Sequence, residues 1–192
     1  MKRIIALFFV FISINCFSQF SKTHYIPPLT CITNLAGEQY LYISTPSTNN
    51  VNFKIIANGG STITGVVSKS KAFVYPIGQG INTQLIIQKE STGIVRNKGY
   101  VIEAEDQIYA SVRINSGLSQ SGYVHAGGLV SKGNSALGKT FRLGAMLNPV
   151  YDTSLLNFAS ILSTENGTKV TISNIPNGTN LSNGTTVTGP IT

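Results

Sequence analysis

The stretch SGYVHAGGLVSKGNSALGKTFRLG, residues 121–144, decides the fold class because it supports two opposed interpretations. Within it, residues 133–140 (GNSALGKT) match the phosphate-loop pattern of nucleotide-binding enzymes. Such a loop holds phosphate only where a helix begins at its Lys-Thr pair. Residues 140–149 instead alternate apolar and polar side chains and end at a proline, which predicts a strand. We therefore interpret the glycines as a crossing within a β-domain and expect no nucleotide.

The N-terminus has the features of a cleaved export signal. Two basic residues precede an apolar run at residues 4–14, which is too short to span a bilayer, and Ser18 offers the small residue that a signal peptidase requires. Cys16 would be the anchor of a lipoprotein, but an asparagine precedes it where that processing needs a small residue. We predict a signal peptide at residues 1–18 and a mature domain at residues 19–192 with no membrane span.

The composition of the mature chain limits its partners. Cys31 is its single thiol, so no internal disulfide forms, and we expect Cys31 to be a small core residue. Loss of Lys2 and Arg3 lowers the net charge from +7 to +5, and the remaining charges are scattered singly. Without a basic run or a basic face interleaved with aromatics, nucleic acid is disfavoured. The charge suits an anionic cell surface or polysaccharide.

Almost every segment alternates with period two. The predicted strands are residues 40–44, 51–55, 62–67, 72–77, 83–88, 100–105, 108–115, 158–163 and 169–173. Turns are predicted at 45–50 and at the Asn-Gly pairs that begin at Asn58, Asn166, Asn177 and Asn183. Strands at intervals of about ten residues with such punctuation indicate an all-β protein, a β-sandwich of mainly antiparallel strands.

The strongest local signal is a hairpin at residues 100–115. The even-numbered residues, from Tyr100 to Ile114, are mostly apolar and are expected to face inward. Glu105, Asp106 and Gln107 are polar and form the predicted connection between the two strands.

Two constellations are candidates for chemistry. His125 lies in the glycine-rich stretch near Ser131 and Ser135, and a histidine beside an activated serine is the arrangement of a hydrolase. His24 is the other histidine, but it precedes Pro27-Pro28 in a segment expected to be extended. No Gly-x-Ser-x-Gly motif is present. We expect a histidine satisfied by local hydrogen bonds and keep an exported hydrolase or carbohydrate-active enzyme using His125 as the alternative.

The acidic cluster of Glu103, Glu105 and Asp106 is the second constellation. Glu103 and Glu105 share one face of a predicted strand, and their carboxylates together with Asp106 offer oxygen ligands of the kind that Ca²⁺ prefers. Their spacing matches no calcium loop, so the interpretation as the solvated corner of a hairpin stands beside the calcium hypothesis.

Five segments resemble a known family: FSQ (17–19), SKTHYIPPL (21–29), QYLYISTP (39–46), HAGGLVSKGNSALG (125–138) and FRLGAMLN (141–148). They are similar to the N-terminal region of very large secreted surface proteins of gliding bacteria, which usually end in a gliding-motility-associated C-terminal sorting domain. The chain resembles more loosely the N-terminal domain of IgG Fc-binding proteins. The resemblance covers nearly the whole mature chain and implies an exported, adhesin-like β-sandwich module. It supplies no catalytic residues or cofactors.

These observations favour a secreted or cell-surface adhesion module that is not an enzyme. Its expected partner is a surface protein or a polysaccharide. A structural spacer domain is a further alternative. Residues 185–192 begin another predicted strand, so we expect the chain to be the N-terminal piece of a longer protein with downstream domains.

Overall fold

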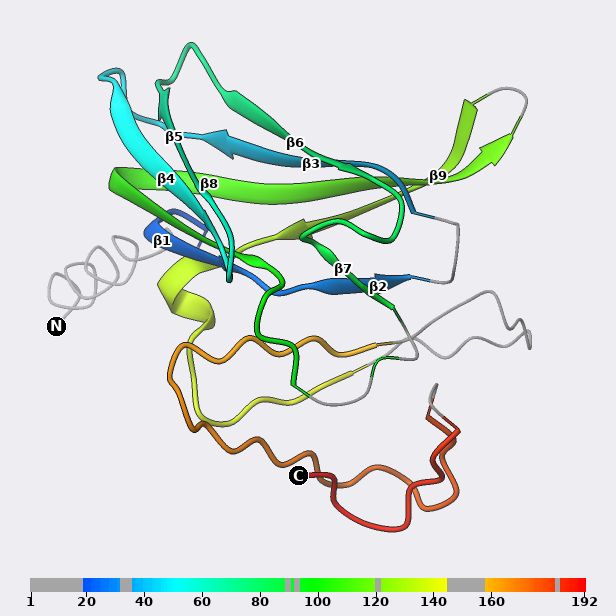
Figure 1. The fold of residues 1–192 in the computed structure, drawn as a ribbon. Coiled ribbons are helices and arrows are strands. Elements are labelled where there is room, and N and C mark those ends of the chain that lie inside the picture. The colour runs from blue at the N-terminus through cyan, green and yellow to red at the C-terminus, as the bar shows by residue number, and fades with distance from the viewer. Residues whose placement is uncertain are drawn as a thin grey trace, which may run out of the picture.

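The computed structural model describes residues 19–31, 36–88, 91, 94–119, 122–144, 158–181 and 184–192. Within these ranges the protein is all-β and mostly antiparallel, as the sequence predicts, and its strands gather above a long C-terminal coil (Figure 1). The strands are β1 (Ser21–Ile26), β2 (Leu29–Cys31), β3 (Ala36–Ser44), β4 (Val51–Ala57), β5 (Thr62–Val67), β6 (Phe73–Gln79), β7 (Ile86–Gln88), β8 (Tyr100–Ser119) and β9 (Gly122–Val130). The described part holds no helix long and apolar enough to cross a membrane.

Strand β8 is the centre of the sheet. Its first half pairs with β1 and β4, and its second half pairs with β3 and β9. Strand β5 then adds to β4 and β6 adds to β3, which completes a seven-stranded sheet. A separate parallel pair, β2 and β7, lies beneath it (Figure 1).

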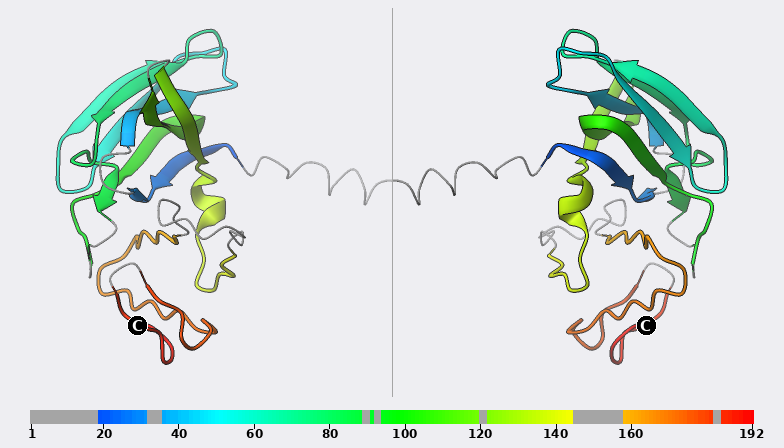
Figure 2. Two further views of the ribbon diagram at one scale, coloured as in Figure 1. Left: turned by 90° about the vertical axis from the view of Figure 1, so that its right-hand side faces the viewer. Right: turned by 90° about the vertical axis from the view of Figure 1, so that its left-hand side faces the viewer.

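The sheet curls nearly into a barrel around one apolar core (Figure 2). Inward side chains of both halves of β8 meet those of β3 and β4, because alternate residues of a strand point to the same face. The most deeply buried members include Leu41, Ile43, Phe53, Ile55, Ile102, Ile108, Ala110 and Val112. Val51, Phe53 and Ile55 are all buried while Asn52 and Lys54 are exposed, which confirms the predicted alternation.

The predicted hairpin at residues 100–115 is wrong, although its inward face is right. Glu105, Asp106 and Gln107 lie within β8, which runs on through all three exposed residues. The Thr45 hydroxyl donates to the Gln107 carbonyl, and the Asn52 amide donates to Glu105, so the residue after β3 and strand β4 support β8 where a turn was expected. A hairpin turn and a continuous strand would both expose these polar side chains to water. Only the contacts with Thr45 and Asn52 distinguish the two.

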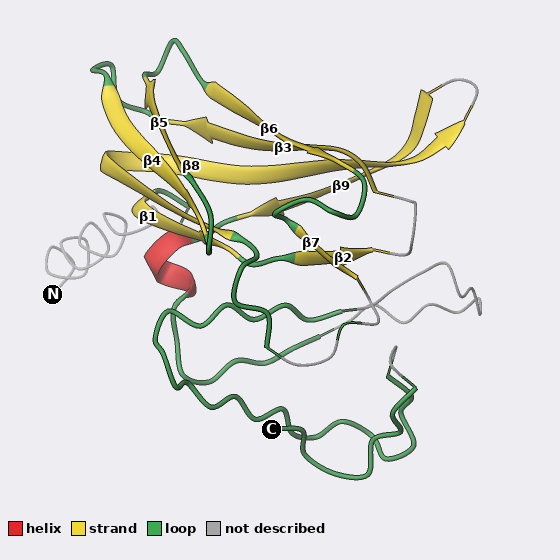
Figure 3. Ribbon diagram, in the orientation of Figure 1, coloured by secondary structure: helices red, strands yellow, loops and turns green. Residues whose placement is uncertain are grey.

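Several predicted C-terminal strands are also wrong. Residues 140–144 form no strand, and Phe141 and Leu143 are 62% and 58% exposed. Residues 158–163 and 169–173 are loops, apart from an isolated bridge between Ile172 and Ile191 (Figure 3). These segments have alternating apolar residues but no neighbouring strand to satisfy their backbone groups.

The predicted Asn-Gly turns hold where the structure describes them. The turn at Asn58 joins β4 to β5, with Gly59 at a φ of 70°. The glycines that follow Asn166, Asn177 and Asn183 also have positive φ, a conformation that glycine adopts without steric cost. Residues 178–181 and 184–187 pair with each other, and in this pairing Val187 donates to Thr179 and Gly178 donates to Val187.

Some sequence-based predictions lie outside the described residues. They are the signal peptide at residues 1–18 with Cys16, and residues 145–149 of the predicted strand. Cys31 is described: it is half-buried at the end of β2 and packs against the core, and burial raises the pKa of its thiol.

Gly65 makes room for the largest core contact of β4. Phe53 lies opposite Gly65 across the β4–β5 pair, and its ring packs edge-on against Phe73 with centroids 5.0 Å apart. A Cβ atom at position 65 would lie 2.3 Å from the tip of the Phe53 ring. We expect Gly65→Ala to lower the free energy of unfolding by about 1–3 kcal/mol, because the buried ring has little space to move. Chemical denaturation would measure this change.

Thr64→Ala is the matched control, since Thr64 is exposed on the same strand. It should change stability by less than about 1 kcal/mol. A Gly65→Ala protein as stable as the wild type would show that the core yields around Phe53.

Candidate functional site

The outer face of the β6-β3-β8-β9 half of the sheet carries two tyrosines beside an arginine. Tyr40 and Tyr42 alternate with the buried Gln39, Leu41 and Ile43 and therefore point away from the core. Their ring centroids are 6.2 Å apart, and the planes are tilted by 55°. The Arg113 guanidinium carbon lies 6.0 Å from the centroid of the Tyr42 ring.

Strand register places this cluster on the middle strands of this half of the sheet. Tyr40 faces Pro76 on β6 and Arg113 on β8, and Arg113 in turn faces Gly128 on β9. The adjacent row across the same strands contains Val74, Tyr42, Ser111 and Val130. Val74 and Val130 are 46% and 38% exposed, so both ends of this row are open to solvent. We call Tyr40, Tyr42, Val74, Arg113 and Val130 the tyrosine face.

The outer face of the other half is chemically different. There β4 presents Asn52 and Lys54, and β8 presents Glu103 and Glu105. The Asn52 side-chain amide donates to a Glu105 carboxylate oxygen at 2.7 Å. This half thus presents polar and charged side chains, two of which bond to each other, whereas the tyrosine face carries aromatic rings and a cation.

The predicted acidic corner is solvated. Glu103, Glu105 and Asp106 are all exposed, and Asp106 accepts from the backbone N–H of Gln107. Among the described residues, no group of three or more His, Cys, Asp or Glu side chains is placed to hold a metal ion.

The residues of the hydrolase alternative do not come together. His125 lies on β9 opposite Ser116, whereas Ser131 follows the end of β9 and donates its N–H to the carbonyl of Ala110. Six residues of extended chain span about 20 Å, so His125 and Ser131 are far apart. The Ser131 hydroxyl donates to Tyr25, and that of Ser135 donates to Lys132.

The segment that matches the phosphate-loop pattern packs against β1. Gly133–Ala136 forms one turn of 3-10 helix, and residues 137–144 are not helical, so no helix begins at Lys139 and Thr140. Gly133 is buried at a φ of 56°, and a Cβ atom there would lie 2.3 Å from Cβ of Ser21. This close approach to β1 leaves no room for phosphate at Gly133.

His24 is a buried polar residue of β1, the strand that Gly133 contacts. It points inward from β1 in phase with Ile26, and both side chains are fully buried. Its Nε2 lies 2.8 Å from the Ile108 carbonyl and donates to it, while Nδ1 is buried with no partner. Burial lowers the pKa of His24, and the carbonyl contact only partly opposes this effect. The histidine is therefore neutral and structural.

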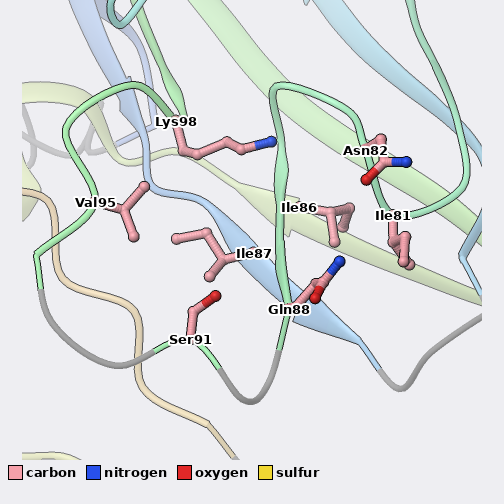
Figure 4. Close-up of a pocket in the computed structure, with 8 residues that line it drawn as sticks. All are labelled: Ile81, Asn82, Ile86, Ile87, Gln88, Ser91, Val95 and Lys98. Carbon is pink, nitrogen blue, oxygen red and sulfur yellow. The ribbon is translucent and has the colours of Figure 1, made fainter.

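A hollow of about 240 Å³ lies between the segment through β7 and the segment before β8 (Figure 4). It is lined by Ile81, Asn82, Ile86, Ile87, Gln88, Ser91, Val95 and Lys98. The Lys98 ammonium donates to the carbonyl of Thr83, and the Thr83 hydroxyl donates to buried Gln39 at 2.6 Å. Lys98, the one cation of this lining, thus links the segment before β8 to β3 through Thr83. The other lining residues are four aliphatic and three uncharged polar side chains.

Comparisons with known proteins give a distant structural likeness. No protein-family model and no curated protein matches the chain. The crystal structure of Thermotoga maritima 1070 is similar over 59% of this chain and 97% of that one, with 11% sequence identity and a TM-score of 0.36.

Sequence reasoning missed the tyrosine face and the burial of His24. The alternation of Tyr40 and Tyr42 with apolar residues was readable, but Arg113 is 71 positions from Tyr42 along the chain and only strand register joins them. For His24, the signal was its two-residue spacing from Ile26.

We expect stability to fall in acid because of His24. Its pKa in the folded state lies below the unfolded value of 6.5, so the unfolded state takes up a proton first as pH falls. The folding free energy contributed by neutral His24 is fully present above pH 6.5. It declines below that value, with a slope of up to about 1.4 kcal/mol per pH unit, and the loss is complete below the folded pKa. Denaturant titrations between pH 8 and pH 5 would measure the decline.

The chain offers a matched pair of variants, since it has two histidines. His24→Gln should flatten the pH dependence, whereas His125→Gln should leave it unchanged. Equal profiles for wild type and His24→Gln would contradict the assignment.

Proposed function

We propose that the protein is an exported, non-catalytic binding module that holds an acidic polysaccharide on the tyrosine face. The observation that carries the proposal is the placement of Arg113 beside the ring of Tyr42, with Tyr40 next to it, on an open sheet surface. The same face offers neither a carboxylate pair nor a nucleophile with its base among the five residues that define it.

The chemistry of this face fits a sugar chain. One side of a pyranose ring presents C–H bonds, which carry partial positive charge and pack on the negative face of an aromatic ring. A guanidinium pairs with carboxylate or sulfate groups through two parallel hydrogen bonds. Tyr40 and Tyr42 supply the rings and Arg113 supplies the cation. The net charge of +5 that remains after loss of Lys2 and Arg3 favours the approach of an anionic chain.

The cellular location and the sheet architecture are part of the proposal. The predicted N-terminal export signal and the resemblance to surface proteins of gliding bacteria support a secreted or cell-surface adhesion role, with downstream domains of a longer protein among its proposed neighbours. The two halves of the sheet share β8 and enclose the core between them, which supports describing them as the layers of a β-sandwich whose strands bend from one layer into the other.

We expect Tyr40→Ala and Tyr42→Ala each to weaken binding to immobilised alginate by about ten-fold, equivalent to about 1.4 kcal/mol. Arg113→Gln should weaken it similarly and reduce its dependence on salt, because the charged contact is lost. Binding isotherms at two salt concentrations would measure both effects, with dextran as the uncharged comparison.

Tyr25→Ala is the matched control, since Tyr25 lies on β1, on the other half of the sheet. It should bind alginate like the wild type. No binding by the wild type, or equal loss in Tyr25→Ala, would overturn the proposal. Shortening of the alginate chains during incubation would contradict the non-catalytic part.

A second expectation concerns export. Signal peptidase should cut after Ser18, so the protein recovered outside the producing cell should begin at Gln19. Mass spectrometry of its N-terminal peptide would test this. A lipid-modified N-terminus at Cys16 would show that the anchor interpretation is the right one.

A further inference from the structure

We infer that two copies of this chain pair through the free edge of β9, so that their sheets join into one. Strand β9 pairs with β8 on one side, and no other described strand pairs with it. Its end with β8 projects from the body of the molecule (Figure 1). The pairing between copies does not depend on the proposed polysaccharide binding.

The backbone groups on the free edge can be assigned. Ser131 donates its N–H to Ala110 of β8, so Ser131 directs its backbone groups toward β8. In an antiparallel ladder alternate residues direct N–H and C=O to opposite sides. Ala126, Gly128 and Val130 therefore direct theirs away from β8, and none of the backbone hydrogen bonds identified among the described residues reaches those groups.

The other edges carry features that prevent strand addition. Strand β6 contains Pro76, which has no N–H, and β1 contains Lys22 and runs into two prolines. Strand β5 is six residues long and leads into the turn that holds Lys69 and Lys71. Natural sheets use prolines, charges and short strands to keep their edges from pairing. Strand β9, nine residues long, contains no proline, lysine, arginine or acidic residue.

The edge is complementary to itself. Ala126 is the central residue of Gly122–Val130 and directs its backbone groups outward. A two-fold axis at Ala126 would place it opposite its own copy in a hydrogen-bonded pair, with Gly128 opposite Val124 and Val130 opposite Gly122. Lys132, the nearest cation along the chain, would lie about 40 Å from its copy at 3.3 Å per residue. Arg113, which faces Gly128 from the neighbouring strand, would lie about 20 Å from its copy by the same strand dimensions, well beyond the screening length of about 8 Å at physiological salt.

Pairing would also place two tyrosine faces on one surface. Ala126, Gly128 and Val130 share the outer face with Arg113. A two-fold axis perpendicular to the sheet keeps the outer faces of both copies on the same side. The two β3 strands would then be separated by five strand spacings, or about 24 Å, and one polysaccharide chain would contact both copies with a gain in avidity.

Ala126→Pro tests the pairing, because proline removes an N–H from the free edge and leaves the ladder with β8 intact. Ala126→Ser retains the N–H and is the matched control. Light scattering of the exported chain at tens of micromolar should give twice the monomer mass for wild type and Ala126→Ser, and the monomer mass for Ala126→Pro.

Ala126→Cys tests the register and does not require the proline variant to fold. Two cysteines opposite each other in a hydrogen-bonded pair lie about 5.5 Å apart at Cα, within reach of a disulfide. Mild oxidation should give a covalent dimer on a non-reducing gel, whereas Val74→Cys, on the far strand of the same face, should not. A monomeric wild type, a dimeric Ala126→Pro or the absence of a crosslink through position 126 would overturn the inference.

Discussion

The structure depends on the backbone pairing of β8 along both of its edges. Four strands hydrogen-bond directly to it, and two more attach through these four. Because residues 105–107 are exposed yet remain in the strand, β8 passes from one half of the sheet to the other without a chain reversal. The same inward series, from Tyr100 to Val112, can then fill the core from both halves.

Local periodicity was enough to predict which residues of the strands are buried, but not how the strands are connected. The inward positions of β4 and β8 follow from alternation alone. The polar run at residues 105–107 is compatible with a hairpin or with a bent strand, since either keeps these side chains in water. The choice depends on contacts with Thr45 and Asn52, which lie more than fifty residues away in sequence. In the C-terminal segments the side chains alternate in the same way, but no partner strand is present there among the described residues, so no strand forms.

The candidate site was less predictable than the fold for the same reason. The glycines and His125 of residues 125–138 match patterns of functional sites, yet Gly127 and Gly128 lie within β9, and Gly133 permits a close packing contact with Ser21. The tyrosine face has no sequence motif, since it is assembled from β3, β6, β8 and β9 by register. His24 looked like part of an extended entry segment, and its burial appears only once β9 and the turn after it pack on β1.

The outward residues of β8 explain why the two halves of the sheet differ in chemistry. Glu103 and Glu105 lie in the half of β8 that pairs with β4, whose outward residues are Asn52 and Lys54. Arg113 lies in the half that pairs with β3, whose outward residues include Tyr40 and Tyr42. A slip of one residue in the pairing of β8 would turn these charges inward and the core residues outward. The register that buries the core is therefore the register that exposes Arg113 beside Tyr42, and stability and the proposed recognition surface depend on the same set of backbone hydrogen bonds.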